Sequence, residues 1–330
     1  MDIDLSDMKK KEFQETLAYW NQVAELSTVD SCAWRNYVFH SNVFHKKVCS
    51  REVLFHEISS RLKANESFSC ARLGHTEVRI AGEYLEKQFG IRSMYSSEIK
   101  RYLLETSGFF LEKEGSEEEI DCYAQMTLEA CAEIDILLVY ASWKYYTYIA
   151  NNFCPYAVLA PRAAQPYDSE RRLIPWFDGL SGKKVLVVSS FSHSIEHQYA
   201  RKNKICKYPE WELPDFELKT FQMIETQFGN KRGYKNWFSA YNDVKGRILS
   251  MDFDVAIIGA GAYGFPLTAA LRKRGKMVIE LCSYTAMMFG IVGQRHIDFG
   301  FKEQYGTDEW IRPLETPPEY YKKIEGGCYW

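Results

Sequence analysis

The residues best suited to chemistry in this sequence are Arg72-Leu73-Gly74-His75-Thr76-Glu77, which follow a short apolar run. Gly74 permits a tight turn, and Arg72 is suited to pairing with a phosphate. His75 and Glu77 flank one residue, so an imidazole and a carboxylate could both reach a divalent cation held at a diphosphate. A plain helix start, with Glu77 favoured by the helix dipole, explains the same residues. Taken alone, the segment favours that plainer interpretation.

Two further turns carry small residues that suit an anion. Ser189-Ser190-Phe191-Ser192-His193-Ser194 offers hydroxyls and backbone N–H groups, although simple N-capping needs only one serine. Gly259-Ala260-Gly261-Ala262-Tyr263-Gly264 fits G-x-G-x-x-G between a strand and a helix, and Glu280 ends the next strand. That pattern is the dinucleotide fingerprint. It begins at residue 259 of 330, too late for the rest of a dinucleotide-binding sheet, whereas a diphosphate from another nucleotide would use the same physics.

One segment matches a metalloprotease pattern. His193-Ser194-Ile195-Glu196-His197 reads H-x-x-E-H, and two histidines four residues apart on a helix could share a zinc ion. No third ligand is evident nearby, so histidines on the surface of a helix are the preferred interpretation.

The elements that must position these residues recur as an apolar strand, a turn of small residues and a helix. Strands are predicted at 68–73, 136–140, 157–160, 184–189, 254–258 and 277–281. Helices are predicted near 13–23, 50–64, 76–89, 116–134, 194–204, 236–251 and 265–274. This alternation predicts an α/β fold with a mostly parallel sheet, and such folds bind ligands at the carboxyl ends of strands. The informative turns are therefore 72–77, 140–145, 189–196 and 259–264.

Composition narrows the function classes. The chain has 330 residues, 46% of them hydrophobic and 26% charged, which excludes a disordered chain and allows two domains or one large one. No apolar run is long enough for a transmembrane helix, and the acidic start Met1–Leu5 lacks a signal core, so secretion is not expected. A net charge of −3 provides no basic field to recruit nucleic acid.

Cysteine and aromatic residues are both numerous. The nine cysteines are odd in number and show no C-x-x-C spacing, which favours reduced cytosolic thiols over disulfides or a zinc site. Aromatic residues make up 15% of the chain. Rings often line clefts, sugar-binding clefts among them, although much of this excess must be ordinary core. Trp143, Tyr145 and Tyr263 lie on or near strand-end turns and could stack on a base or a sugar.

Five segments in order resemble one family, the GT-D-type glycosyltransferases of bacterial polysaccharide and glycoprotein assembly. They span residues 72–330, and no single piece is specific. The matching segments are Arg72–Glu77, Val185–Ile195, Asp254–Gly264, Phe289–Arg295 and Glu325–Trp330.

The resemblance implies metal-dependent transfer of a sugar from a UDP- or GDP-sugar to a saccharide or lipid-linked saccharide acceptor. It implies a Rossmann-like catalytic domain at 67–330, preceded by a helical region at 1–66. It makes His75 and Glu77 the catalytic and metal-binding residues, with Mn²⁺ or Mg²⁺ as the metal. The donor-binding residues that it implies are Arg72, Gly74, Ser189, Ser190, Ser194, Gly259, Gly261, Tyr263 and Gly264. The protein is expected in the cytoplasm, with peripheral contact at the inner face of the membrane left open.

The sequence departs from the family pattern at two places. His75 stands where the family's Asp-x-Glu motif has aspartate, which puts the metal in question and would favour Mn²⁺. Cys282–Ala286 replaces a Gly-Gly and a Gln found in many relatives, so sugar or acceptor specificity cannot be carried over. The candidates for taking the acceptor proton are His75, Glu77, Glu196 and His193. Two alternatives stay open: an NAD- or FAD-dependent oxidoreductase using Gly259–Gly264, and a non-catalytic sugar-nucleotide-binding relative.

Overall fold

The fold is built on a seven-stranded, entirely parallel sheet. The computed structural model describes residues 4–26, 45–46, 48–139, 143–161, 176–324 and 326–330. The strand order is β3-β2-β1-β7-β6-β4-β5. The strands are β1 (Ser69–Ala71), β2 (Ile136–Val139), β3 (Val158–Pro161), β4 (Lys184–Ser189), β5 (Glu217–Gln222), β6 (Val255–Gly259) and β7 (Met277–Glu280). The predicted α/β class with a parallel, Rossmann-like sheet and flanking helices is confirmed.

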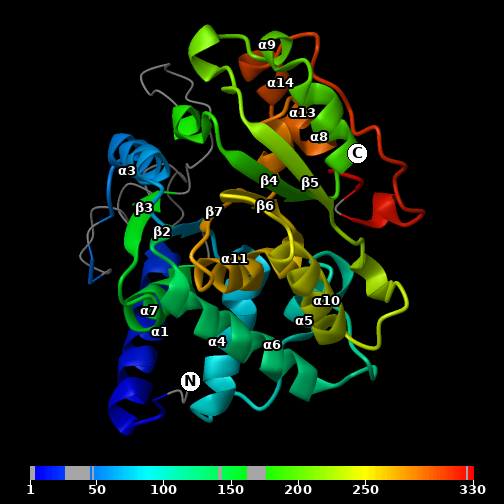
Figure 1. Cartoon of the computed structure of the whole chain (residues 1–330). Coiled ribbons are helices and arrows are strands. Elements are labelled where there is room, and N and C mark those ends of the chain that lie inside the picture. The colour runs from blue at the N-terminus through cyan, green and yellow to red at the C-terminus, as the bar shows by residue number, and fades with distance from the viewer. Residues whose placement is uncertain (1–3, 27–44, 47, 140–142, 162–175, 325) are drawn as a thin grey trace.

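Helices cover both faces of this sheet (Figure 1). The α-helices are α1 (Asp7–Leu26), α3 (Arg51–Ala64), α4 (His75–Gln88), α5 (Ser97–Glu105), α6 (Glu117–Ala130), α7 (Trp143–Phe153), α8 (Ser192–Tyr199), α9 (Lys202–Ile205), α10 (Trp237–Leu249), α11 (Gly264–Arg272), α12 (Tyr284–Met287), α13 (Gln294–Asp298) and α14 (Phe301–Tyr305). Their starts follow local chemistry. Ser50 and Ser116 cap α3 and α6 by accepting a hydrogen bond from the N–H three residues on.

Strand residues alternate between two hydrophobic cores. Along β4, Leu186 and Val188 enter the larger core, whereas Val185 and Val187 enter the other, as the two-residue period of a strand requires. The larger core holds α1, α4, α6, α7, α10 and α11, which lie below the sheet in Figure 1. The second core holds α3, residues 176–180, α8 and α12. Together they bury nearly half of the chain's phenylalanine, tyrosine and tryptophan side chains, so much of the aromatic excess is core.

The N-terminal helices contribute to both cores. Phe13, Leu17 and Trp20 of α1 belong to the larger core, where α1 packs on α7. The buried side of α3 packs instead on residues 176–180 in the second core. The helical character predicted for residues 1–66 is therefore present in α1 and α3. Among the described residues, no helix is both long and apolar enough to cross a membrane.

One strand, β5, was not predicted from the sequence. β5 reads Glu-Leu-Lys-Thr-Phe-Gln and lies at the edge of the sheet, paired only with β4. An edge strand is solvated along one side, so it needs no apolar run and gives no strong periodic signal. The short helices α12–α14 are missed because four or five residues show no 3.6-residue period, and α5 and α7 are not predicted either. The single helix predicted near 194–204 is divided into α8 and α9.

The order of the strands creates a crevice between β4 and β6. The chain leaves β4 for β5 and leaves β6 for β7, in opposite directions. The helices after these strands also lie on opposite faces, with Ile195 of α8 in the second core and Leu267 of α11 in the larger one. Open parallel sheets bind ligands at such a switch point, beyond the carboxyl ends of the strands.

Candidate active site

A cavity of about 900 Å³ opens at this edge of the sheet. Its walls come from the segments that follow β1, β4, β5, β6 and β7, and from the C-terminal part of the chain. A volume of that order suits a drug-sized or nucleotide-sized ligand. Eight of the eleven site residues predicted from sequence line the cavity: Arg72, Gly74, His75, Glu77, Ser189, Ser190, Gly259 and Gly261.

Arg72, Glu77 and Glu280 form one electrostatic cluster in the cavity wall. Burial and, to a smaller extent, the nearby Glu77 raise the pKa of Glu280 to about 8, against the opposing charge of Arg72. Burial also raises the pKa of Glu77, again against Arg72. Oε2 of Glu280 is buried without a hydrogen-bond partner among the described residues. At neutral pH Glu280 is therefore the protonated member of the carboxyl pair, because two carboxylates this close do not both ionise readily.

His75 and Glu77 are not brought together as a metal pair. Both lie inside α4, and residues two apart on a helix point to different faces. The charged neighbours of His75 are Arg79 and Glu98, and burial followed by Arg79 lowers its pKa. Among the described residues, no three His, Cys, Asp or Glu side chains gather closely enough to hold a metal ion. The predicted two-residue cation site therefore does not fit this geometry.

Glu77 also has a structural reason for its place. Gly74 is the N-cap of α4 and has no side chain to cap the helix. The carboxylate of Glu77 accepts a hydrogen bond from its own backbone N–H and lies where a side chain at residue 74 would stand. Gly74 is thus required by Glu77, and the segment is a helix start whose acidic residue lines the cavity.

Of the three predicted serines, two line the cavity and one does not. Ser189 ends β4 and Ser190 follows it at the cavity wall. Ser194 is fully buried inside α8, where its N–H donates to Glu315 at 3.0 Å and its hydroxyl also contacts the Glu315 carboxylate. A carboxylate from the C-terminal segment therefore satisfies Ser194, and this residue is unavailable to a ligand in the cavity.

The glycine-rich turn is filled by the protein itself. The N–H of Ala262 donates to the carbonyl of Ser107 at 2.8 Å, and a side chain at Gly261 would stand 2.7 Å from that same oxygen. Gly261 has φ +50°, in the region that favours glycine. A side chain at Gly264 would overlap Oε1 of Glu280. Gly261 thus leaves room for the Ser107 carbonyl, and Gly264 leaves room for Glu280. Of the three glycines in this turn, Gly259 and Gly261 line the cavity and Gly264 does not.

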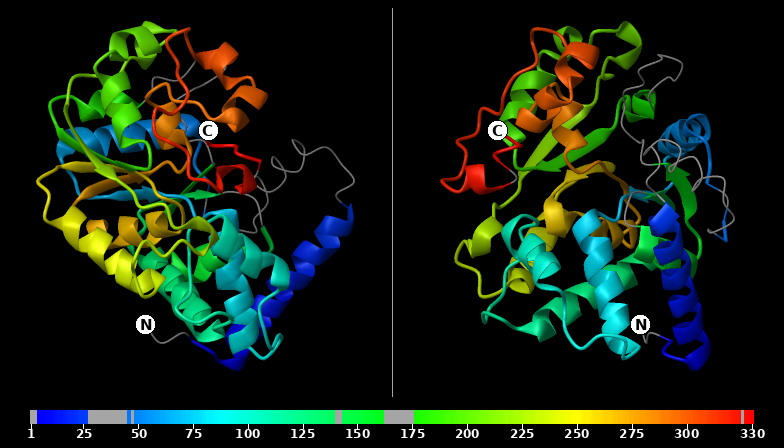
Figure 2. Two further views of the ribbon diagram at one scale, coloured as in Figure 1. Left: turned by 90° about the vertical axis from the view of Figure 1, so that its right-hand side faces the viewer. Right: turned by 180° about the vertical axis from the view of Figure 1, so that it is seen from behind.

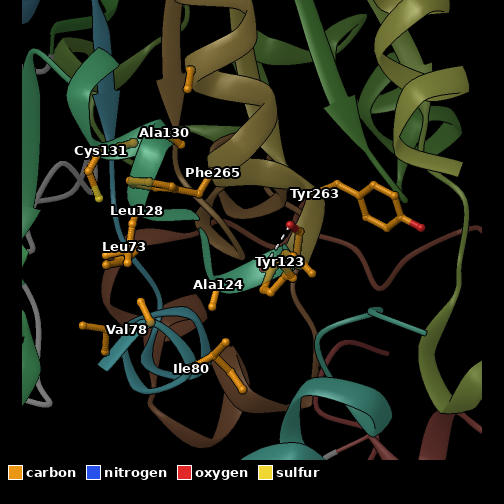
Figure 3. Close-up of a cluster of buried hydrophobic side chains, with 14 of the residues drawn as sticks. Leu73, Val78, Ile80, Tyr123, Ala124, Leu128, Ala130, Cys131, Tyr263 and Phe265 are labelled. Carbon is orange, nitrogen blue, oxygen red and sulfur yellow. Dashed lines mark hydrogen bonds between the residues drawn. The ribbon is translucent and has the colours of Figure 1, made fainter. Parts of the chain in front are cut away.

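Tyr263 belongs to the core below the cavity. Its ring packs 4.9 Å from Trp237, centroid to centroid, and its hydroxyl lies 3.1 Å from the Thr226 hydroxyl. Figure 3 shows it beside Tyr123 within the cluster of buried side chains. It borders a separate cavity of about 50 Å³ and is not among the residues that line the larger one. Tyr145 is likewise buried, with its hydroxyl donating to Glu86, whereas the side chain of Trp143 lies outside the described residues.

The H-x-x-E-H segment lies away from the cavity. His193, Glu196 and His197 are exposed on α8. The carboxylate of Glu196 accepts a hydrogen bond from Thr220 of β5, and His197 lies 3.2 Å from Arg201. These contacts agree with histidines on a helix surface. They also remove Glu196 and His193 from the candidates for taking an acceptor proton in the cavity.

The cavity contains residues that the sequence did not single out. Glu225, after the edge strand β5, lines it with one buried carboxylate oxygen that has no partner among the described residues. Its strand gave no apolar pattern, so nothing local marked it. Arg295 also lines the cavity, with its guanidinium 5.2 Å from the ring of Tyr329. Tyr329 and Trp330 close the wall from the C-terminus. Arg295 and both rings do lie in matched segments, a signal that could have found them.

No protein-family model matches this chain, and no curated protein matches it. Two solved structures are similar to it, each at 14% identity over 85% of this chain and 95% of the other. One, with a TM-score of 0.43, is described as "Selenomethionine substituted structure of domain of unknown function 1792". The other, at 0.44, is described as "The highly conserved domain of unknown function 1792 has a distinct glycosyltransferase fold". At 14% identity and TM-scores below 0.5, these two structures do not assign a function to this chain.

Proposed function

We propose that this protein is a glycosyltransferase that binds a nucleotide-sugar in the cavity and transfers the sugar to a saccharide acceptor. The observation that carries the proposal is the convergence of Arg72, Glu77 and Glu280 with Ser189 and Ser190 at one switch-point cavity. The arginine and the two serine hydroxyls could bind a diphosphate. The two carboxyl groups could accept the proton that the acceptor hydroxyl loses. We include in the proposal peripheral contact with the membrane and a role in surface polysaccharide assembly.

Arg72 and the serine hydroxyls would stabilise the leaving diphosphate. As the bond from the sugar to the diphosphate breaks, negative charge grows on the phosphate oxygen, and preorganised donors around it lower the barrier. Arg72 is fixed at the end of β1, and Ser189 and Ser190 at the end of β4. Because the predicted metal pair does not converge, no step of this proposal passes through a metal ion.

A carboxylate would take the proton of the acceptor hydroxyl. Glu77 is the better candidate of the coupled pair, because Glu280 keeps its proton to a higher pH. A carboxyl group whose pKa is raised toward neutrality is a stronger base than one in water. Glu225 reaches the same cavity, and burial raises its pKa as well. Glu225 is therefore the second candidate for the residue that takes the acceptor proton.

The structure gives specific reasons to prefer this function over a dinucleotide oxidoreductase. In a dinucleotide site the glycine turn leaves room for a pyrophosphate, and the acidic residue after the next strand binds ribose. Here the Ser107 carbonyl occupies the approach to Gly261, and Glu280 is buried against Gly264. Both features needed for NAD or FAD are thus already used by the protein.

The test is incubation of the purified chain with a panel of UDP- and GDP-sugars, with and without Mn²⁺ or Mg²⁺. Release of UDP or GDP, or sugar transfer to added oligosaccharides, is expected for at least one donor. Thermal stabilisation by UDP or GDP without turnover would favour a non-catalytic binding protein. Co-purification of NAD or FAD without nucleoside-diphosphate binding would favour the oxidoreductase. Binding of no nucleotide under any of these conditions would overturn the proposal.

A further inference from the structure

One end of the cavity is lined by rings from three short C-terminal helices and their connections. Tyr284 of α12, His296 of α13, Phe299 directly after α13, and Phe301 of α14 all line it. The ring of His296 lies 6.2 Å from Phe301 and 6.3 Å from Tyr284, centroid to centroid. Phe299 is 65% exposed, an unusual position for a phenylalanine at a cavity rim. In both views of Figure 2 this orange part of the chain lies on the same lobe as the red C-terminal segment.

His296 presents an unused hydrogen-bond donor in this ring cluster. Its side chain is only 4% exposed. Nδ1 accepts a hydrogen bond from the N–H of Gly293 at 3.2 Å, which places the hydrogen of a neutral imidazole on Nε2. Nε2 is buried and has no hydrogen-bond partner among the described residues. A buried donor left unpaired is costly, so its presence at a cavity wall points to a ligand oxygen as its partner.

The imidazole is neutral in this environment. Burial, followed by the charges of Arg295 and Arg312, lowers the pKa of His296 to about 4. His296 is therefore a fixed N–H donor and carries no positive charge at neutral pH. A neutral donor suits a hydroxyl or ring oxygen better than it suits a phosphate, which would draw on the charge of Arg295 instead.

We propose that this end of the cavity is a saccharide subsite, in which a sugar hydroxyl accepts a hydrogen bond from His296 Nε2 and the sugar ring packs on the surrounding aromatic side chains. The inference deepens the proposed function by assigning the acceptor sugar to this end and the diphosphate to the Arg72 end. Sugar rings carry apolar C–H faces and hydroxyl oxygens, so they need an aromatic surface together with neutral hydrogen-bond donors.

The ring geometry favours a sugar over a nucleobase. A base binds best between parallel faces, because it is flat. The described rings here are mostly inclined to one another: Tyr284 lies at 39° to Phe301, and Phe299 at 46°. The one nearly parallel pair, His296 and Phe301, is formed by two neighbours in the protein. Inclined rings form a curved apolar wall that fits a non-planar ring.

The experiment is saturation-transfer NMR and calorimetry on the full chain with a panel of methyl hexopyranosides and methyl N-acetylhexosaminides, with UDP and GDP in parallel. For the wild type we expect saturation transfer to at least one saccharide. His296→Phe keeps a ring but removes the hydrogen-bond donor. It should lower the affinity for that saccharide about tenfold, the effect expected for the loss of one buried hydrogen bond. His296→Gln, which can accept from Gly293 and still donate, should restore most of the affinity.

Three further variants, all at exposed positions, make the test independent of whether a substitution at the buried His296 disturbs folding. Phe299→Ala removes an exposed ring and should weaken saccharide binding, whereas Tyr156→Ala, at a residue 84% exposed and outside the cavity lining, should not. His197→Phe, on the exposed side of α8, is the matched control for His296→Phe.

The outcomes separate this inference from the proposed function. Saccharide binding that depends on His296, in a protein that never binds a nucleotide, would support the subsite while removing the donor assignment. The subsite is overturned if no saccharide in the panel binds or if His296→Phe binds saccharide as the wild type does. It is also overturned if His296→Phe and Phe299→Ala lower the affinity for UDP or GDP and leave saccharide binding unchanged. That result would make this end of the cavity the nucleobase site.

Discussion

The buried carboxyl pair makes the stability of this protein depend on pH, with Glu280 as the largest contributor. Glu280 has a folded-state pKa of about 8 against 4.5 for an ordinary glutamate. Below pH 4.5 both the folded and unfolded states hold the proton. Between pH 4.5 and 8 the unfolded chain releases it and the folded protein keeps it, so the free energy of unfolding falls as pH rises. Above pH 8 the folded protein releases this proton too, and the free energy of unfolding lost through Glu280 stays constant.

We therefore expect Glu280→Gln to remove the largest part of this loss of stability, leaving the smaller contributions of Glu77 and Glu225, whose pKa values burial also raises. Relative to the wild type, the variant should gain on the order of a few kcal/mol between pH 5 and pH 8. Urea unfolding at a series of pH values measures the difference. Glu319→Gln, at an exposed position, is the control and should leave the pH dependence unchanged. A Glu280→Gln protein that loses as much stability as the wild type over the same window would contradict the assignment.

Glu77 is the residue on which the proposed chemistry depends most. Glu77→Gln keeps the size of the side chain and its place above Gly74 but removes the base. We expect sugar transfer to fall at least about 100-fold, the usual contribution of a general base, with UDP or GDP binding retained. Steady-state rates and calorimetry check the two halves of this prediction. Glu196→Gln on the exposed face of α8 should be silent, and a larger loss in Glu225→Gln would move the base to Glu225.

At the scale of elements, the glycine turn before α11 is held by the loop after α5. Gly261 combines a positive φ with the Ser107 carbonyl 2.7 Å from the position of a side chain. Gly275 is a matched control, because its φ is +75° and nothing lies near it. Gly261→Ala should therefore cost about 1–3 kcal/mol of stability, more than Gly275→Ala. Equal losses in thermal and urea unfolding would show that Ser107 does not press on this turn.

At the scale of the whole molecule, the arrangement predicts where a nucleotide protects the backbone. The proposed diphosphate site is made by segments far apart in the chain, at 72–77, 189–191 and 280–283. On addition of a binding nucleoside diphosphate, hydrogen exchange should slow in these three segments together. It should not change in α1 or in β3 at the far edge of the sheet. Protection confined to one segment would contradict a shared site.

Much of this architecture follows from local sequence. The apolar strands and the helices after them are predictable because a buried parallel strand and an amphipathic helix each impose a short period on neighbouring residues. The same logic places Arg72, Ser189 and Gly259 at strand ends, and the cavity lies there. Spacing alone also predicted a His75–Glu77 cation site, which α4 does not support because the helix turns the two side chains to different faces.

The sequence by itself determined the alternation of strands and helices and the turns that carry polar residues. Only the tertiary structure decided which of those residues meet. Ser107 comes from a distant loop to fill the glycine turn, and Glu315 comes from the C-terminal segment to satisfy Ser194. His296 gains its ring neighbours from helices too short to show a period. These contacts join residues far apart in the chain, and no local pattern records them.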